Sequence, residues 1–269
     1  MSWVITGQEA GPLGLLDQYG GAAAAYSLRN LSLYHADPVV RVRRDNDNAE
    51  QDFTATEVSD GTLAAWVGAG NNGFVRTWYD HSGNGYDMIQ ANVTAQPSVV
   101  SSGTLQTLSA KPTLVFDGTN DFMNQPTGAN WQSISCVARY SKNLTQFSDF
   151  DSIVGGINTS GSNAGIGIIG GGSTTALRTG GQWGDEFYYN GGVYIPDATV
   201  FPSVTNKALI TFISTDAVTG VSGLQIGRDR DQLGRFWGGA ISEIIVYPSN
   251  QSANRTAVEA NINAHYSIY

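Results

Sequence analysis

The chain has 269 residues, of which 41% are hydrophobic and only 14% carry a charge. Its 14 basic and 23 acidic residues give a net charge of −9, so nucleic acid and anionic membranes are poor partners. Glycine contributes 33 residues, and this composition excludes a coiled coil, a helical repeat and a charged disordered tail but suits short strands joined by tight turns.

The first 16 residues predict an arm, followed by one domain over residues 17–269. Trp3, Val4 and Ile5 are apolar but belong to no periodic pattern, so we expect them to dock on a partner chain. The segment has no basic start and no long apolar core, so we do not expect a signal peptide. No apolar run approaches the about 20 residues of a membrane helix.

Short helices are predicted near the N-terminus. Four alanines favour a helix over Ala22–Leu33, and Asp60 can cap a second helix that runs through Val67. Between them, residues 38–44 alternate between apolar and basic side chains, which predicts a strand.

From Gly73 onward the pattern is strand and turn. Strands are predicted at about residues 74–79, 86–90, 113–116, 134–140, 152–157, 165–169, 174–179, 187–194, 208–214, 223–226 and 235–247. A last helix is predicted over residues 252–265, with Ser252 as its N-cap. This order predicts an all-β sandwich of two antiparallel sheets with five residues inside it: Val115, Cys136, Ile210, Ile244 and Val246.

Most chemical motifs are absent or out of context. Two Gly-x-Gly-x-x-Gly matches, at residues 68–73 and 165–170, lack the strand before and the helix after that a phosphate site needs. The three histidines show no metal-ligand spacing, so no metal site is predicted from them. Acidic turns at residues 45–52, 80–85 and 117–121 are typical of local backbone capping, with Ca²⁺ as the alternative.

Aromatic residues gather around paired glycines between residues 180 and 194. Trp183, Tyr188 and Tyr189 could stack on the apolar faces of sugar rings, although aromatic residues in strands are usually core. We predict that any glycan site lies on these loops, with Asp229 and Arg230 as polar partners.

Several segments resemble the concanavalin A-like domain of glycoside hydrolase family 54, the α-L-arabinofuranosidases. The similar segments lie in residues 17–121 and 224–266 and are Ala25–Arg29, Val40–Arg44, Trp78–Gly85, Ile226–Asp229, Phe236–Gly239, Tyr247–Ser249 and Val258–Ile262. The resemblance implies a concanavalin A-like jelly roll with short N-terminal helices and a C-terminal helix. It also implies that Asp229, after an Ile-Gly pair, matches the family's general acid/base.

The framework is also similar to laminin-G-like lectin domains in virion proteins of tailed bacteriophages. The similar segments are Leu15–Asp17, Gly21–Arg29, Asp47–Asp52, Lys111–Gly118 and Ile241–Tyr247. This resemblance implies a capsid decoration or tail receptor-binding protein.

The hydrolase interpretation lacks a second carboxylate in the sequence. The family's nucleophile is a Glu on a middle strand, and only Asp185 and Glu186 lie near the right place, without a motif around them. One carboxylate alone cannot carry out double displacement.

The sequence therefore predicts a virion structural protein that is not an enzyme, with arabinofuranosidase-type hydrolysis as the alternative. A bacterial lectin-like module is a third hypothesis. The virion hypothesis implies other capsid or tail proteins as partners, cell-surface glycans as ligands, a trimer as a candidate assembly, no cofactor, and assembly in the host cytoplasm.

Overall fold

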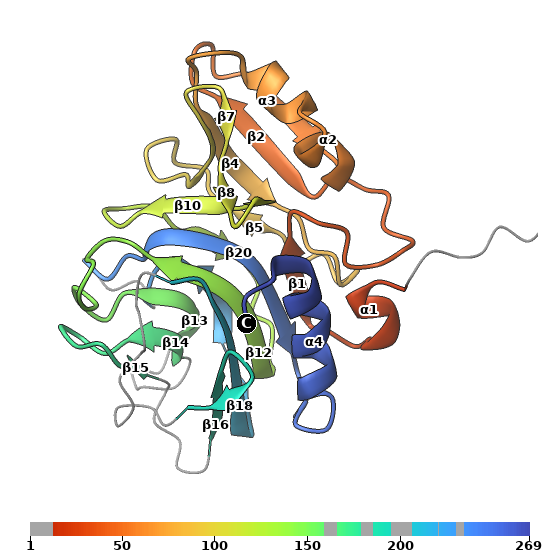
Figure 1. Cartoon of the computed structure of the whole chain (residues 1–269), viewed down its shortest axis with the longest axis vertical. Coiled ribbons are helices and arrows are strands. Elements are labelled where there is room, and N and C mark those ends of the chain that lie inside the picture. The colour runs from red at the N-terminus through yellow and green to blue at the C-terminus, as the bar shows by residue number, and fades with distance from the viewer. Residues whose placement is uncertain (1–12, 159–165, 179–184, 195–205, 220, 230–233) are drawn as a thin grey trace, which may run out of the picture.

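The computed structural model describes residues 13–158, 166–178, 185–194, 206–219, 221–229 and 234–269. Two antiparallel sheets are stacked, and the strands of a smaller lobe that carries two helices join them into one continuous hydrogen-bonded sheet (Figure 1). The predicted all-β sandwich is confirmed. None of the described helices is long and apolar enough to cross a membrane.

The first sheet is built around the antiparallel neighbours β12 (Trp131–Tyr140) and β20 (Gly238–Tyr247). Its other strands are β1 (Ala24–Ser27), β10 (Leu114–Asp117), β16 (Glu186–Tyr189), β17 (Gly192–Val193) and β18 (Ala208–Val218). The second sheet contains β5 (Met88–Ile89), β11 (Met123–Gln125), β13 (Ser152–Asn158), β14 (Ile166–Gly170), β15 (Leu177–Arg178) and β19 (Val221–Ile226).

The small lobe contains the remaining strands and two helices. The strands are β2 (Val40–Arg44), β3 (Glu50–Phe53), β4 (Gly73–Trp78), β6 (Ser98–Ser101), β7 (Thr104–Leu105), β8 (Thr107–Leu108) and β9 (Lys111–Pro112), and the helices are α2 (Ala55–Ser59) and α3 (Thr62–Val67). Two further helices, α1 (Leu15–Gln18) and α4 (Arg255–Tyr266), pack on the first sheet.

Every residue of β20 is buried because both faces of its sheet are covered. Ile244 and Val246 face the second sheet, whereas Ile245 and Tyr247 join a second apolar cluster with α1 and α4. Successive side chains of a strand point to opposite faces of its sheet, and here each face is covered by another layer. The described part of the fold is therefore helix on sheet on sheet.

Four of the five predicted core residues are buried, and one is not. Cys136, Ile210, Ile244 and Val246 lie in the core, but Val115 is only half-buried. Its neighbours on β10 point inward instead, so the predicted face of that strand is shifted by one residue.

The N-terminal helix predicted over Ala22–Leu33 is wrong. Residues 24–27 form β1, which pairs with residues 243–246 at the other end of the chain. Pairing with a distant buried strand overrides the local helix preference of alanine. Two short helices, α2 and α3, stand where one was predicted. Thr54 is the N-cap of α2 and forms a capping box with Glu57. The Asp60 carboxylate accepts the N–H of Thr62, the first residue of α3.

The predicted boundary between arm and domain falls inside α1. Leu15 is fully buried in the cluster beneath α4, so the chain is packed before residue 17. The C-terminal helix is confirmed, but it begins at Arg255, three residues after the predicted cap.

Candidate functional site

Two buried carboxylates lie at one end of the second sheet. Asp151 directly precedes β13, and Asp229 follows β19. These strands are antiparallel neighbours with Val154 opposite Ile226, so the start of one and the end of the other meet at the same edge. The topology therefore brings together two residues that are 78 positions apart in the chain.

A segment around Phe236 passes between the two carboxylates. Phe236 forms one bridge to Ser152, beside Asp151, and another to Arg228, beside Asp229. Phe236 thus lies between Ser152 and Arg228, and two successive strand spacings put the backbones of these two residues about 9–10 Å apart. The two carboxylates thus face a common strip of backbone from opposite sides.

Asp229 is held by Arg235. Its Oδ2 accepts a hydrogen bond from the Arg235 guanidinium at 2.8 Å, and its backbone N–H donates to the Arg235 carbonyl at 3.2 Å. The Asp229 side chain has no exposed surface, whereas the Arg235 side chain is 28% exposed. The guanidinium also lies 4.7 Å from the ring centre of Phe150. A buried negative charge is thereby compensated by a cation that reaches solvent.

Asp151 has a similar arrangement with different partners. Its Oδ1 accepts from the Lys142 ammonium at 2.9 Å, and its Oδ2 accepts from the Tyr140 hydroxyl at 2.6 Å. Asp151 is fully buried, and Lys142 is 23% exposed. Lys142 also donates to the Phe236 carbonyl at 3.2 Å, which ties it to the strip between the carboxylates. Burial, and then the hydrogen bond to Asp151, raises the pKa of Tyr140, so the phenol remains a donor at neutral pH.

Aromatic rings support this end of the sandwich. Tyr140 packs edge-on against Phe147 and Trp237, with ring centres 4.9 and 5.0 Å away. Edge-to-face packing of this kind fixes ring orientation. The Tyr140 hydroxyl is therefore held rigidly against Asp151.

A third buried carboxyl lies at the same edge of the sheet but faces another cavity. Asp121 precedes β11, which pairs with β19, and its side chain lines a pocket of about 310 Å³ with Phe74 and Gln96. Its Oδ2 accepts the backbone N–H of Asp117 at 2.9 Å. Burial, and then the negative charge of Asp117, raises the pKa of Asp121 to about 7.

The raised pKa of Asp121 predicts a pH-dependent cost to stability. The folded state holds this proton up to about pH 7, whereas the unfolded chain releases it near 3.8, so the Asp121 contribution is lost as pH rises through this window. We expect Asp121→Asn to gain about 1–4 kcal/mol of unfolding free energy over the native chain between pH 4 and pH 8. Urea unfolding at both pH values measures the difference. Equal differences at both values would contradict the assignment, and the exposed Asp216→Asn is the control.

Several predicted site residues lie outside the described residues. These are Trp183 and Arg230 of the predicted glycan site and Trp3, Val4 and Ile5 of the predicted docking arm. Their roles stay predictions.

The structure places Tyr188 and Tyr189 on β16, away from the end of the second sheet that carries Asp229. Tyr188 lies opposite Thr211, which lies opposite Ser135 on β12. Ser135 is five residues from Tyr140, which holds Asp151, and five residues of strand span about 17 Å. Tyr188 and Tyr189 on β16 therefore lie far along the sheet from the end that carries Asp229.

Tyr188 and Tyr189 have other surroundings. The Tyr188 hydroxyl donates to Glu186 at 2.6 Å, and the Arg255 guanidinium lies 3.8 Å from its ring centre. Tyr189 packs against the core and lines a different pocket. One face of the half-buried Tyr188 ring is thus covered by a helix side chain.

Neither Asp185 nor Glu186 can partner Asp229. Glu186 lies opposite Ile213, which lies opposite Ser133 on β12, and Asp185 accepts the N–H of Thr215 still further along. Ser133 is seven residues, or about 23 Å, from Tyr140. A glycosidase needs its two carboxyls roughly 5–9.5 Å apart, so this pair is excluded.

Asp151 is the residue that the sequence did not single out. It directly precedes the predicted strand at 152–157, as Asp229 follows the predicted strand at 223–226. Had these strands been recognised as antiparallel neighbours, their polar ends would have been placed together. The sequence pattern alone does not reveal that pairing.

In the acidic turn at residues 45–52, which was considered for Ca²⁺, three carboxylates bond to protein partners. Asp45 bonds to Asn72, Asp47 pairs with Arg44, and the third, Asp52, pairs with Arg41. Among the described residues, no group of three or more His, Cys, Asp or Glu side chains is placed to hold a metal ion.

Comparison with known proteins identifies the fold. No protein-family model and no curated protein matches the chain. Similar solved structures include a family 54 α-L-arabinofuranosidase soaked with a cyclic sulfate inhibitor, at 16% identity and TM-score 0.61. They also include an arabinofuranosidase complexed with arabinofuranosyl-α-1,2-xylobiose, at 17% identity and TM-score 0.60. A mutant family 54 enzyme soaked with 4-nitrophenyl α-L-arabinofuranoside is similar at 16% identity and TM-score 0.61.

These matches cover 94% of this chain but only 65% of each solved chain. The chain thus spans about two thirds of the length of the structures it resembles.

The prediction of a non-enzymatic virion protein is wrong. The solved structures with this fold are arabinofuranosidases, which favours the hydrolase alternative, and nothing in the comparisons supports the lectin-like domains of phage virions. The predicted partners, trimer and location followed from the virion interpretation and stay predictions. At this level of identity the likeness establishes that the chain has the sandwich fold of the family 54 arabinofuranosidases.

Proposed function

We propose that the protein hydrolyses glycosidic bonds of the α-L-arabinofuranoside type, with Asp229 and Asp151 as its two carboxylates. The observation that carries the proposal is their convergence at one end of the second sheet, each fully buried and each paired with a partly exposed cation. Paired carboxyl groups are the chemistry that most glycosidases use. The shared fold and the Ile226–Asp229 segment, which resembles the family's acid/base segment, support the same assignment.

Asp229 has the role of general acid in this proposal. It protonates the glycosidic oxygen as the bond from the anomeric carbon to that oxygen breaks, and water then supplies a hydroxyl to the carbon and restores the proton. Asp151 is either the base that activates the water or the nucleophile that first bonds to the carbon. Inverting and retaining glycosidases differ in these two roles, so the stereochemistry of the product decides between them.

The positions of Arg235 and Lys142 indicate the side from which a sugar would reach the carboxylates. Arg235 and Lys142 are the partly exposed members of the two ion pairs, so they lie between the carboxylates and solvent. Substrate hydroxyls would accept hydrogen bonds from these two side chains, and Asp229 becomes accessible when Arg235 moves aside. The Lys142 ammonium stays within hydrogen-bond distance of Asp151 and compensates a buried carboxylate there.

A panel of 4-nitrophenyl glycosides tests the proposal. We expect the purified full chain to release 4-nitrophenol from the α-L-arabinofuranoside faster than from the β-D-xyloside, β-D-glucoside or β-D-galactoside. Proton NMR of the first product would then show an inverted anomeric centre if Asp151 is the base, and a retained one if it is the nucleophile. Absence of release from every member, with the protein folded by circular dichroism, would contradict the proposal.

A further inference from the structure

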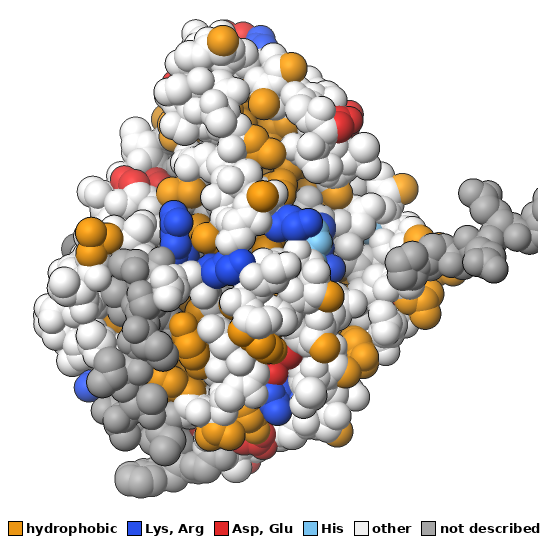
Figure 2. Space-filling model, viewed as in Figure 1, with side chains coloured by type: hydrophobic (Ala, Val, Ile, Leu, Met, Phe, Trp, Pro, Cys, Tyr) orange, Lys and Arg blue, Asp and Glu red, His pale blue; other side chains and the backbone are white. Residues whose placement is uncertain are grey.

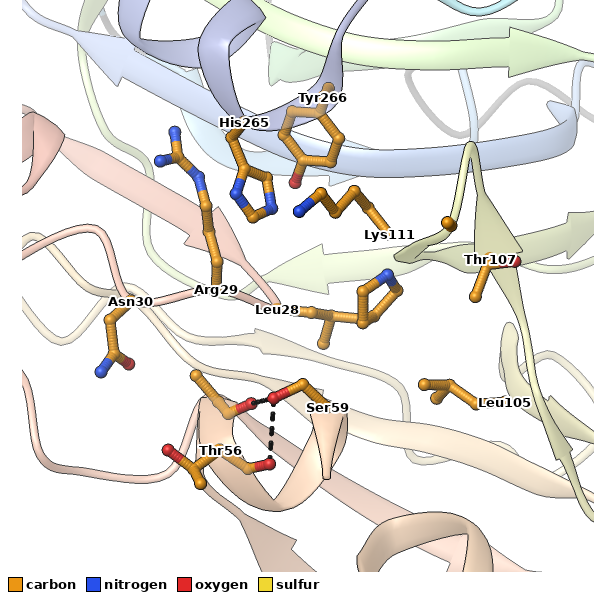
Figure 3. A pocket seen from close by; sticks show the side chains of 13 residues that line it. Leu28, Arg29, Asn30, Thr56, Ser59, Leu105, Thr107, Lys111, His265 and Tyr266 are labelled. Carbon is orange, nitrogen blue, oxygen red and sulfur yellow. Dashed lines mark hydrogen bonds between the residues drawn. The ribbon is translucent and has the colours of Figure 1, made fainter. Parts of the chain in front are cut away.

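A second pocket lies between the small lobe and the end of α4. Its volume is about 420 Å³, within the roughly 300–1,000 Å³ range of small-molecule sites. Figure 3 shows α2 on one side of it, with His265 and Tyr266 from α4 and Lys111 from β9 on the other. None of the lining residues belongs to the Asp151 and Asp229 site.

The pocket is cationic although the protein carries a net charge of −9. Arg29 and Lys111 line it, and no Asp or Glu does. Arg29 is already committed, because its guanidinium pairs with the buried Glu243 at 2.8 Å. Lys111, in contrast, has no side-chain hydrogen bond or ion pair with any part of the chain that the structure describes. Its charge is therefore available to a ligand.

A neighbouring pocket is also lined by basic side chains. It has a volume of about 380 Å³ and is lined by Arg139 and Lys207, and none of the described residues that line it is acidic. The hairpin of β8 and β9 contributes to both pockets, through Ser109 to one and through Lys111 to the other. Figure 2 shows basic side chains gathered in the middle of this face of the molecule. Four of the 14 basic residues thus line two adjoining pockets.

We propose that the larger pocket binds a sugar that carries a carboxylate, such as a uronic acid. The Lys111 ammonium would bind the carboxylate. The hydroxyls of Ser59 and Thr107 and the amide of Asn30 line the same space and can bond to sugar hydroxyls. Leu28 and Leu105 offer an apolar wall to the C–H face of the ring. The proposal does not depend on the hydrolase assignment, since it concerns binding at different residues.

His265 provides a reporter inside the pocket. Figure 3 shows its imidazole between the Arg29 and Lys111 side chains. Burial, and then the positive charge of Arg29, lowers the pKa of His265 to about 4; Lys111 lowers it further, and Glu243 opposes the shift. The remaining neighbour on α4 is Tyr266, and the α2 residues that line the pocket, Ala55, Thr56 and Ser59, carry no charge. A bound carboxylate adds a negative charge and therefore raises this pKa.

Titration of the full chain with sodium D-glucuronate tests the proposal. Calorimetry should show binding that is at least about tenfold tighter than that of D-xylose or D-glucose at equal ionic strength, a difference of about 1.4 kcal/mol. Histidine NMR should show the pKa of His265 rising by about one unit on saturation. Lys111→Met should remove both effects, and Lys111→Arg should keep them.

Matched controls distinguish binding at this pocket from a general effect of the protein's charge. Arg41→Met removes a surface cation elsewhere and should leave glucuronate binding unchanged. Equal affinity for neutral sugars, or a Lys111→Met variant that is folded and binds as before, would overturn the proposal. Equally tight binding of inorganic sulfate or phosphate would also overturn it, because the pocket would then be a simple anion site.

Discussion

Asp229→Asn should lower kcat on 4-nitrophenyl α-L-arabinofuranoside by about 10²–10⁴-fold while the protein stays folded. General acid catalysis contributes an effect of this size, and asparagine cannot donate a proton to the leaving oxygen. The substitution keeps the shape of the side chain and leaves its amide able to bond to Arg235. Because the Arg235 guanidinium is 28% exposed, it can be solvated once the carboxylate is gone.

The same argument applies to Asp151→Asn, where the partly exposed Lys142 can be solvated and the Tyr140 hydroxyl retains an acceptor. Steady-state kinetics and thermal unfolding of both variants are compared with Asp216→Asn, an exposed aspartate on β18. We expect melting temperatures within a few degrees of the native chain, since about 1 kcal/mol shifts a domain of this size by about 2–4 °C. Full activity in folded Asp229→Asn would remove this residue from the mechanism.

Arg29→Met should reduce the unfolding free energy by about 3–5 kcal/mol. This is the largest loss of stability that we expect from a single substitution of a partly exposed residue. Arg29 forms two hydrogen bonds with the fully buried Glu243, at 2.8 and 2.9 Å, and another with Asn261 of α4 at 3.1 Å. Glu243 also accepts from Ser27 of β1 at 2.9 Å. This pair thus joins β1, β20 and α4, and its loss leaves a buried carboxylate without a cation.

A double substitution distinguishes the ion pair from simple packing. Arg29→Met with Glu243→Met removes both charges, so it should recover most of the stability that Arg29→Met alone loses. Urea unfolding at pH 7 gives the three free energies. A loss below about 1 kcal/mol in Arg29→Met, or a double variant no more stable than the single one, would show that Glu243 is not held by this charge.

The longer strands after Gly73, such as β12 and β20, were predictable because their alternation is local and their turns are rich in glycine and asparagine, whereas β6 and β11 were not predicted. Cys136 and Ile244 were placed in the core by that alternation alone, and the structure buries both. The segment Ala24–Ser27 was not predictable in this way. Its four residues read as helix locally, but they form a strand because residues 243–246 offer a buried partner.

The candidate site was predictable only in part, for a related reason. Asp229 was found through its neighbours in sequence, which resemble a known motif. Asp151 has no such motif, and its role depends on the register between β13 and β19 and on contacts with Tyr140 and Lys142. Side chains joined by strand pairing over 78 residues leave no periodic signal in either segment.

The most direct test of the carboxylate pair is the rate of 4-nitrophenol release by Asp151→Asn, Asp229→Asn and the double variant on 4-nitrophenyl α-L-arabinofuranoside. If the two residues act as one catalytic unit, the double variant should be about as slow as the slower single variant, because losing either member already disables the unit. Folded variants that release 4-nitrophenol at the native rate would contradict the assignment of Asp151 and Asp229 as the catalytic carboxylates.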